Sequence, residues 1–419
     1  MIPFRPPPAF LSQRPQSSKS FARRVRLRNP CSAKWSHGTA IVMRPRLLHC
    51  HSTFNLGGKE ARDVDLMNAW GDTVEHVIVS AIPGAFGARD LIDSVVPVSF
   101  PEHGPPLAGP PSPARLRAIA RWVRSGGFDL VLTFNFGALD VVLARRLFGG
   151  PPLVHHEDGF NEDELVRQKP ARRWFRKITL PAAQTLVVPS RNLERIAATT
   201  WGRAATYIPN GIDMARFKAK PAPDAIPGFV RREGEVIVGT LAGLRPVKNL
   251  PRLVRVFADA SARVPNIPTR LVIVGRGPDE ARIRGEAERL GIADRLIMPG
   301  FLAHPHRYVG LFDIFALSSD SEQFPISLVE AMAAGLPALS TRVGDVAEIV
   351  APSNTAFLAA PADEAALAAA LARLLADPGL RDRIGADNRA KVAAQYTRAA
   401  MVARYAEVYG AAMGRRLYA

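Results

Sequence analysis

Short apolar runs alternate with longer amphipathic stretches along most of the chain after Arg46. Such runs are typical of strands in a buried parallel sheet, and the stretches between them have the spacing of helices. The predicted strands of the first half are Leu47–Leu48, His76–Ser80, Leu130–Thr133, Leu153–Val154 and Thr185–Val188. Those of the second half are Val236–Val238, Leu271–Val274, Arg295–Met298, Ile314–Leu317 and Ala338–Ser340. The alternation predicts an α/β protein with two doubly wound, Rossmann-like parallel sheets.

Helices are expected between these strands. Ser190 is expected to cap a helix that continues through Ile196, because a serine hydroxyl can accept a hydrogen bond from a free amide of the first turn. The other predicted helices cover Arg115–Arg124, Ala138–Leu147, Ala365–Leu375 and Met401–Met413.

The length of the chain and one proline-rich stretch predict two domains. At 419 residues the chain is too long for one ordinary core. The stretch from Lys218 to Glu233 separates the two alternations. We therefore expect an N-terminal domain over 43–215, a linker over 216–234, a C-terminal domain over 235–395 and a last helical segment over 396–419. Two sheets joined in this way are expected to form a cleft between the domains.

The positive charge is concentrated at the start of the chain. Residues 1–59 contain no Asp or Glu, and residues 1–42 hold eight Lys or Arg of a chain whose net charge is +17. This segment is rich in Pro, Ser and Arg and has no helical or strand periodicity, which predicts a disordered basic extension, or a start assigned upstream of Met43. The remaining basic excess fits nucleoside diphosphates or a peripheral contact with an anionic membrane.

The cysteines and the hydropathy indicate the compartment. Cys31 and Cys50 are too few for a disulfide scaffold and have no metal-site spacing. The chain has no run of eighteen apolar residues, so no membrane-spanning helix is expected. We expect a cytoplasmic protein, at the inner face of the membrane if it contacts lipid, without a nucleic-acid partner.

The stretch from Ser318 to Glu348 carries the most chemical information. Glu322 stands in a loop, and Glu330 stands on the helix that follows the loop. Pro325 suits the first turn of that helix, since a missing N–H costs nothing there. The unpaired amides of a helix N-terminus attract anions. A helix N-terminus flanked by two carboxylates suits a sugar phosphate.

Cations and glycines stand after other predicted strands. Gly57 and Gly58 follow the first strand and open a helix, so that the backbone can approach a diphosphate closely. Arg245 and Lys248, three residues apart, follow the first strand of the second half. Two cations in this position can neutralise a leaving diphosphate.

Two further loops follow strands at the edge where doubly wound folds bind ligands. Gly275 and Gly277 form a strand-to-helix turn, without the third glycine of a dinucleotide fingerprint. His155 and His156 follow the strand Leu153–Val154. A histidine there is either structural or directed at a ligand.

The stretch from Glu322 to Glu330 resembles the Glu-Gly-Phe-Gly…Glu-Ala-Met-Ala signature of the retaining nucleotide-sugar glycosyltransferases of family four, which have the two-domain GT-B fold. The resemblance implies that Glu322 lies beside the donor sugar and that Glu330 holds the ribose hydroxyls. The donor-contacting loop between them would be Gln323, Phe324, Pro325 and Ile326. Gln323 and Pro325 replace the two glycines of the signature, and Pro325 has no N–H to donate to the sugar.

The resemblance assigns roles to the other loops. Gly57 and Gly58 match the family's Gly-Gly-x-Glu loop, and Lys248 matches its phosphate-binding lysine. Gly243 stands where the family has an arginine, so Arg245 is expected to take over that role from two positions later. The remaining implied contacts are one of His155 and His156 facing the donor sugar, Gly275 and Gly277 as a wall of the nucleotide pocket, Phe301 near the base, and a last helix that crosses back to the N-terminal domain.

The implied activity is retaining transfer of a sugar from a nucleoside-diphosphate sugar to an acceptor hydroxyl, in polysaccharide, exopolysaccharide or lipid-linked glycan synthesis. No cofactor and no metal are expected, because cations and a helix dipole would stabilise the diphosphate. One alternative is a nucleotide-sugar epimerase of GT-B fold, which converts the donor without an acceptor. Another is an inactive nucleotide-sugar-binding protein, which would release no nucleoside diphosphate.

Overall fold

The computed structural model describes residues 44–160, 164, 168–217 and 221–417. The basic extension expected at 1–42 lies outside these residues. The segment Arg44–Ala419 clusters as one compact unit. In the part of the chain that the structure describes, no helix is both long and apolar enough to cross a bilayer.

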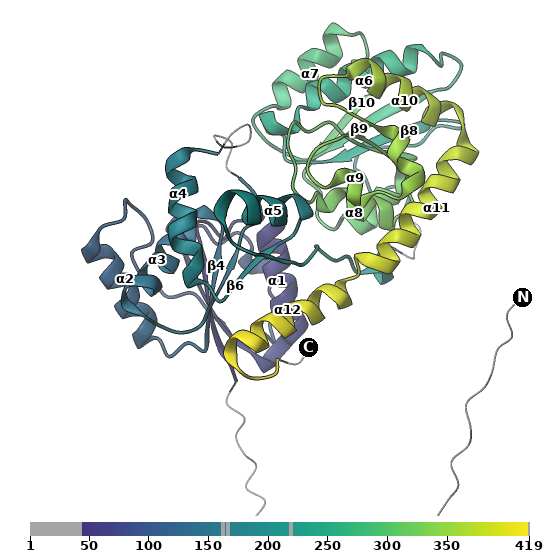
Figure 1. The fold of residues 1–419 in the computed structure, drawn as a ribbon. Helices are drawn as coiled ribbons and strands as arrows, with labels where there is room; N and C mark the ends of the chain where they lie inside the picture. The colour runs from purple at the N-terminus through teal and green to yellow at the C-terminus, as the bar shows by residue number, and fades with distance from the viewer. Residues whose placement is uncertain (1–43, 161–163, 165–167, 218–220, 418–419) are drawn as a thin grey trace, which may run out of the picture. The chain divides into compact units, whose positions relative to one another are not determined.

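The N-terminal sheet has seven parallel strands in the order β3-β2-β1-β4-β5-β6-β7. Figure 1 labels β4 and β6 of this sheet. They are β1 (Arg46–His51), β2 (Glu75–Ser80), β3 (Val98–Ser99), β4 (Leu130–Phe134), β5 (Leu153–His156), β6 (Thr185–Val188) and β7 (Thr206–Tyr207). The five predicted strands are confirmed. The pattern missed β3 and β7, because two residues are too few to show a period.

The C-terminal sheet has six parallel strands in the order β10-β9-β8-β11-β12-β13. They are β8 (Val236–Leu241), β9 (Thr269–Val274), β10 (Leu296–Gly300), β11 (Ile314–Leu317), β12 (Ala338–Thr341) and β13 (Leu358–Ala359). All five predicted strands are present, and only the two-residue edge strand β13 was missed. The division into domains at 216–234 stays a prediction.

The helices of the N-terminal half are α1 (Gly58–Trp70), α2 (Pro113–Ser125), α3 (Leu139–Phe148), α4 (Pro170–Thr179) and α5 (Arg191–Ile196). Those of the C-terminal half are α6 (Leu250–Ala262), α7 (Glu280–Arg289), α8 (Ile326–Ala333), α9 (Val346–Ile349), α10 (Glu364–Ala376), α11 (Pro378–Gln395) and α12 (Arg398–Met413). The Ser190 hydroxyl accepts from the amide of Leu193 at 3.0 Å, which confirms the predicted cap of α5. Pro325 is the last residue before α8 and not part of its first turn.

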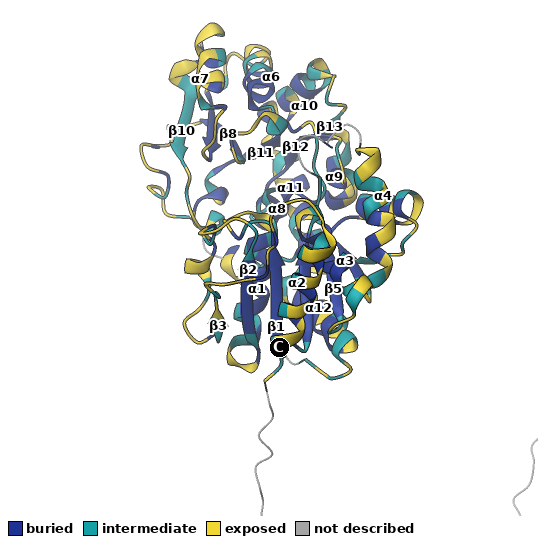
Figure 2. Cartoon of the chain, turned by 90° about the vertical axis from the view of Figure 1, so that its left-hand side faces the viewer, coloured by how far each residue is buried: buried dark blue, intermediate teal, exposed yellow. Residues whose placement is uncertain are grey.

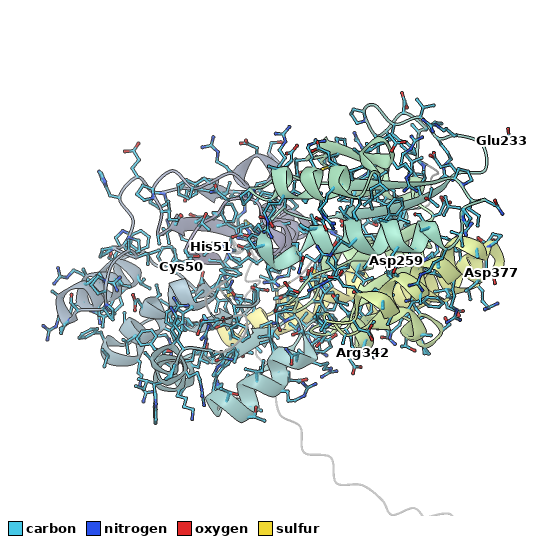
Figure 3. The ribbon with its side chains drawn as sticks, turned by 90° about the horizontal axis from the view of Figure 1, so that it is seen from above. Cys50, His51, Glu233, Asp259, Arg342 and Asp377 are labelled. Atoms are coloured by element: carbon cyan, nitrogen blue, oxygen red, sulfur yellow. The ribbon has the colours of Figure 1, made fainter. Side chains whose placement is uncertain are left out.

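Both faces of the N-terminal sheet are covered, and Figure 2 shows its strands β1, β2 and β5 mostly buried. Successive side chains of a strand point to opposite faces. On β1, Leu47 therefore belongs to one apolar cluster and Leu48 to another. Cys50, labelled beside His51 in Figure 3, is a free and buried thiol, and burial raises its pKa.

Helix α12 completes the core of the N-terminal sheet. Its Met401, Val402, Tyr405 and Tyr409 are buried in one cluster with residues of β1, β4, β5 and β6. Just before α12, Ile212 and Thr397 pair as a parallel bridge. The last helix thus packs on the first sheet, as the resemblance implied.

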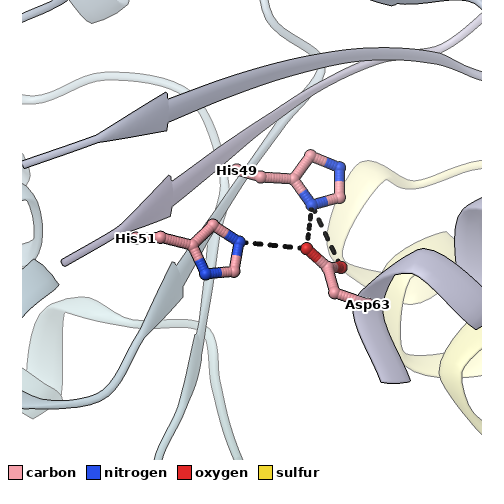
Figure 4. A group of neighbouring side chains, drawn as sticks. All are labelled: His49, His51 and Asp63. Carbon is pink, nitrogen blue, oxygen red and sulfur yellow. Dashed lines mark hydrogen bonds and ion pairs between the residues drawn. The ribbon is translucent and has the colours of Figure 1, made fainter. Parts of the chain in front are cut away.

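A network of buried polar side chains lies between the N-terminal sheet and α1 (Figure 4). Asp63 of α1 bonds to His49 Nδ1 at 2.9 Å and to His51 Nε2 at 3.0 Å, and His49 Nε2 lies 2.9 Å from His76 Nδ1. His51 also stacks on Phe134, with ring centroids 4.1 Å apart. The two histidines stabilise a carboxylate that would be costly to bury alone.

Burial lowers the pKa of three histidines of this sheet, to about 4 for His51 and about 3 for His76 and His156. An unfolded histidine has a pKa near 6.5. Below that pH the unfolded chain binds protons that the native chain does not, so the free energy of unfolding decreases as the pH falls from 6.5 toward 4.

We expect each of these histidines to contribute up to about 1.4 kcal/mol per pH unit to that decrease. Replacing His76 with Gln should therefore reduce the slope of unfolding free energy against pH between pH 6 and 5, measured by urea denaturation. His103 is exposed, and His103→Gln should leave the slope as it is. An unchanged slope in His76→Gln would contradict this account.

Candidate functional site

Two loops lie side by side at the carboxyl end of the C-terminal sheet. The amides of Ala242 and Leu244 donate to the carbonyls of Val274 and Arg276, both at 3.0 Å. A Cβ at Gly275 would overlap the Ala242 carbonyl, and one at Gly277 would overlap the Leu244 carbonyl. Both glycines are therefore needed for the close packing of the loops that follow β8 and β9.

Lys248 and Glu322 come together at this edge. The Lys248 ammonium lies 2.5 Å from Glu322 Oε1, and the Ser319 hydroxyl donates to the same oxygen at 2.7 Å. Only 18% of the Lys248 side chain and 9% of the Glu322 side chain are exposed. A charge-assisted hydrogen bond at this depth fixes both groups. The structure thus places next to each other two side chains that are 74 positions apart in the sequence.

Glu330 lies on α8, two turns after Glu322. Its side chain is half-buried, and burial raises its pKa to about 8. In the described part of the chain no cation pairs with it. An acid in such surroundings is held protonated at neutral pH until a ligand supplies donors for its charged form.

The N-terminus of α1 lies against that of α8. A Cβ at Gly58 would stand 3.3 Å from the Ile326 side chain, so glycine allows this close approach. Gly57 precedes α1 in an extended conformation, and a Cβ there would stand 2.8 Å from the Glu60 carboxylate. Two helix N-termini, each attractive to anions, therefore meet beside the loop that carries Glu322.

A polar bridge joins the two sheets beside Glu322. The Asp345 carboxylate accepts from the amides of Arg191 and Asn192, the latter at 2.8 Å, and so caps α5 from the other half of the chain. Gln323 Oε1 accepts from the Asn192 side chain at 3.2 Å, and the Gln323 carbonyl accepts from the Asp345 amide at 3.2 Å. Gln323, a departure from the family signature, thus takes part in the contact between the halves.

His155 and His156 are both buried in the N-terminal sheet. Both belong to β5, whose two faces are covered, and neither is more than 1% exposed. His155 Nδ1 lies 2.8 Å from the Thr133 hydroxyl, and His156 Nε2 lies 2.8 Å from the Tyr409 hydroxyl. Both imidazoles are buried because the strand runs two residues further than predicted. That one of them faces the donor sugar stays a prediction.

Two family models match the chain in succession. The model described as glycosyltransferase family 4 matches residues 57–216, and the model of glycosyl transferases group 1 matches residues 224–391. The chain is 30% identical to D-inositol 3-phosphate glycosyltransferase 2 of Catenulispora acidiphila over 394 residues, which are 86% of this chain and 92% of that protein. The chain belongs to glycosyltransferase family 4.

Other comparisons agree with this family 4 assignment. The chain is 30% identical over 177 residues to N-acetyl-alpha-D-glucosaminyl L-malate synthase of Bacillus anthracis, and the match covers 42% of this chain and 46% of that protein. It thus spans only about half of the length of some relatives. The structure of Anabaena Alr3699/HepE in complex with UDP-glucose has a TM-score of 0.69 at 21% identity, covering 87% of this chain and 99% of that one. The fold is GT-B.

The other residues that were predicted to contact the donor differ in their exposure to solvent. Arg245 is exposed, and its guanidinium has no hydrogen-bond partner among the described residues. Phe301 is 52% exposed. Phe324 is buried and packs edge-on against Tyr396, with ring centroids 5.5 Å apart. Pro325 is buried beside it. Phe324 and Pro325 therefore support the site loop from inside.

A cavity of about 280 Å³ opens on the Glu330 side of this loop. Lys248 and Glu322 do not line it. Its lining includes Ile326 and Glu330 of α8, His304 and His306 after β10, and Arg62 and Asn210 of the N-terminal half. The sequence did not predict a site role for Arg62, Asn210 or Asp345, because each lies near the site only through contacts with residues far away in the sequence.

One group among the described residues has the composition of a metal site. The donor atoms of His49, His51 and Asp63 lie within 4.8 Å of one another and are buried. Each of these atoms already takes part in a hydrogen bond within the group. We interpret the group as a structural network of the N-terminal sheet.

The bridge through Asp345 predicts a local effect on hydrogen exchange. In Asp345→Ala the amides of Arg191 and Asn192 lose their acceptor, so their exchange should become faster while the central strands stay protected. Asp377 caps α11 through the Leu380 amide at 2.8 Å, and Asp377→Ala is the matched control. It should change exchange at α11 alone. Equal exchange at α5 in both variants would exclude the bridge.

The raised pKa of Glu330 predicts a pH dependence of nucleotide binding. If the ribose hydroxyls donate to the carboxylate, the proton must leave, so affinity for a nucleoside diphosphate should rise between pH 7 and 9. Phosphate groups ionise near pH 6 and are constant in this range. In Glu330→Gln this rise should disappear and affinity should fall by about 1–3 kcal/mol. Calorimetry across this pH range provides the test, and a persistent rise in the variant would refute it.

Proposed function

We propose that this chain is a retaining glycosyltransferase that moves a sugar from a nucleoside-diphosphate sugar to an acceptor hydroxyl. The observation that carries the proposal is the Lys248–Glu322 pair, in which Nζ lies 2.5 Å from Oε1. The pair lies next to the N-terminus of α8. Family membership and the complex of Anabaena Alr3699/HepE with UDP-glucose support a nucleotide-sugar donor.

Each group then has a role in the transfer. Lys248, Arg245 and the amides that open α8 stabilise the negative charge that develops on the leaving diphosphate. Glu330 holds the ribose, and Glu322 contacts the donor sugar. When the diphosphate arrives, Lys248 turns from Glu322 toward the phosphates, which frees the carboxylate for the sugar. The leaving phosphate takes the proton of the acceptor hydroxyl on the same face, so that the anomeric configuration is retained.

The acceptor is a hydroxyl of a glycan or of a lipid-linked glycan, bound on the N-terminal side, and the protein works at the cytoplasmic face of the membrane. The names of two relatives support a hydroxyl acceptor, since L-malate and D-inositol 3-phosphate both carry a hydroxyl. The proposed acceptor domain covers 43–215, and the proposed donor domain covers 235–395.

The test is release of nucleoside diphosphate from UDP-, GDP- and ADP-sugars in the presence of candidate acceptors. The anomeric configuration of the product, read by NMR, decides whether it is retained. Conversion of the donor without an acceptor would identify an epimerase. Binding of the nucleotide sugar without release of nucleoside diphosphate under any condition would identify an inactive binding protein.

We expect Glu322→Gln to reduce turnover by about a hundredfold or more with little change in nucleoside diphosphate affinity, because the contact acts on the sugar in the transition state. Glu288 is exposed on α7, and Glu288→Gln is the control that should keep both quantities. Turnover by single-turnover kinetics and affinity by calorimetry provide the comparison. Normal turnover in Glu322→Gln would remove Glu322 from the mechanism.

A further inference from the structure

Helix α4 places a charged side chain inside and apolar side chains outside. Arg176 is fully buried, while Trp174 is 65% exposed and Ile178 is 50% exposed. Trp174 and Ile178 are four residues apart and share one face of the helix. Figure 2 shows α4 with much of its surface exposed. A buried arginine opposite an exposed tryptophan reverses the usual distribution in water.

The inward face of α4 fixes this orientation. The Arg176 guanidinium donates to both oxygens of Glu157, at 3.2 and 3.3 Å, and lies 3.5 Å from Glu164. It also lies over the rings of Phe136 and Trp201, at 5.0 and 5.2 Å from their centroids. Breaking a buried ion pair leaves an uncompensated charge and costs several kcal/mol, about 3–5 in measured cases. The helix therefore cannot turn Trp174 inward.

The surroundings of the exposed face are cationic. No Asp or Glu occurs between Glu164 and Glu194. Lys177 is exposed, and its ammonium lies 5.3 Å from the centroid of the Trp174 ring. At the end of the neighbouring helix α3, Arg146 is exposed next to Leu147, which is 56% exposed. Exposed apolar side chains and exposed cations thus occur together on α4 and at the end of α3.

We propose that this α4 face, made of Trp174, Lys177 and Ile178, docks on an anionic lipid surface. Tryptophan partitions to the level of the lipid headgroups, and lysine is attracted by the negative potential of anionic lipids. A helix with apolar residues on its outer face and cations beside them is the pattern of interfacial membrane contacts. The cationic rim favours anionic lipid over a second copy of this chain, which would present the same positive charge.

An ion pair connects the docking surface to the carboxyl edge of the N-terminal sheet. Glu157 follows β5 directly, and its pair with Arg176 connects the carboxyl end of that strand to α4. An acceptor embedded in the same membrane would therefore approach the sheet at the edge where parallel folds bind ligands. The docking itself does not depend on the proposed reaction, and its test measures binding alone.

The test is sedimentation of the full chain with vesicles of phosphatidylglycerol and phosphatidylcholine in equal parts, compared with phosphatidylcholine alone. We expect binding to the anionic vesicles and at least about tenfold weaker binding to the neutral ones. The double variant Trp174→Ser, Ile178→Ser should bind the anionic vesicles at least about tenfold more weakly. Val230 is 78% exposed in the C-terminal half, and Val230→Ser is the control that should bind like the original chain.

Lys177→Glu changes charge without removing apolar surface and should also weaken binding to the anionic vesicles. Equal binding of the original chain and either α4 variant would overturn the proposal. Equal binding to neutral and anionic vesicles would overturn it as well. If the chain instead self-associates through Trp174 in sedimentation velocity runs without lipid, a second copy covers the surface and the lipid assignment is wrong.

Discussion

The carboxylate of Asp345 is the contact on which the geometry of the site depends. It caps a helix of the N-terminal half from a loop of the C-terminal half, and its own amide holds the carbonyl of Gln323. The next residue back is Glu322. A change in the position of one sheet relative to the other would therefore move the backbone next to Glu322, the acid that we propose to contact the donor sugar.

Most strands and candidate site residues of the C-terminal half could be predicted, because they belong to short motifs that are local in the sequence. Lys248 and Glu322 could be named from their loop positions together with the resemblance to the family motifs, since parallel strands bring their carboxyl ends to one edge. At His155 and His156 the same rule placed the end of the strand too early. The pairing of β5 with β4 and β6 includes both residues, which are buried and bond to Thr133 and Tyr409.

The contacts between the halves could not be predicted, since they join residues far apart in sequence by single hydrogen bonds. Asp345 and Asn192 are 153 positions apart, and nothing in either neighbourhood specifies the other. Polar interior groups follow the same logic. Asp63 and Arg176 are buried only because partners from other elements bond to them, so the sequence shows an isolated charge where the fold has a hydrogen-bonded group.

Helix α12 determines when the N-terminal sheet can complete its folding. The tyrosines that fill the space against β4 and β5 are synthesised long after the strands they cover. Domains otherwise tend to fold as they leave the ribosome. Here one apolar face of the first sheet stays uncovered until the second half of the chain has emerged. Until α12 has been made, the apolar residues of β1, β4, β5 and β6 that it covers stay exposed, so loss of α12 would destabilise the sheet farthest from it in sequence.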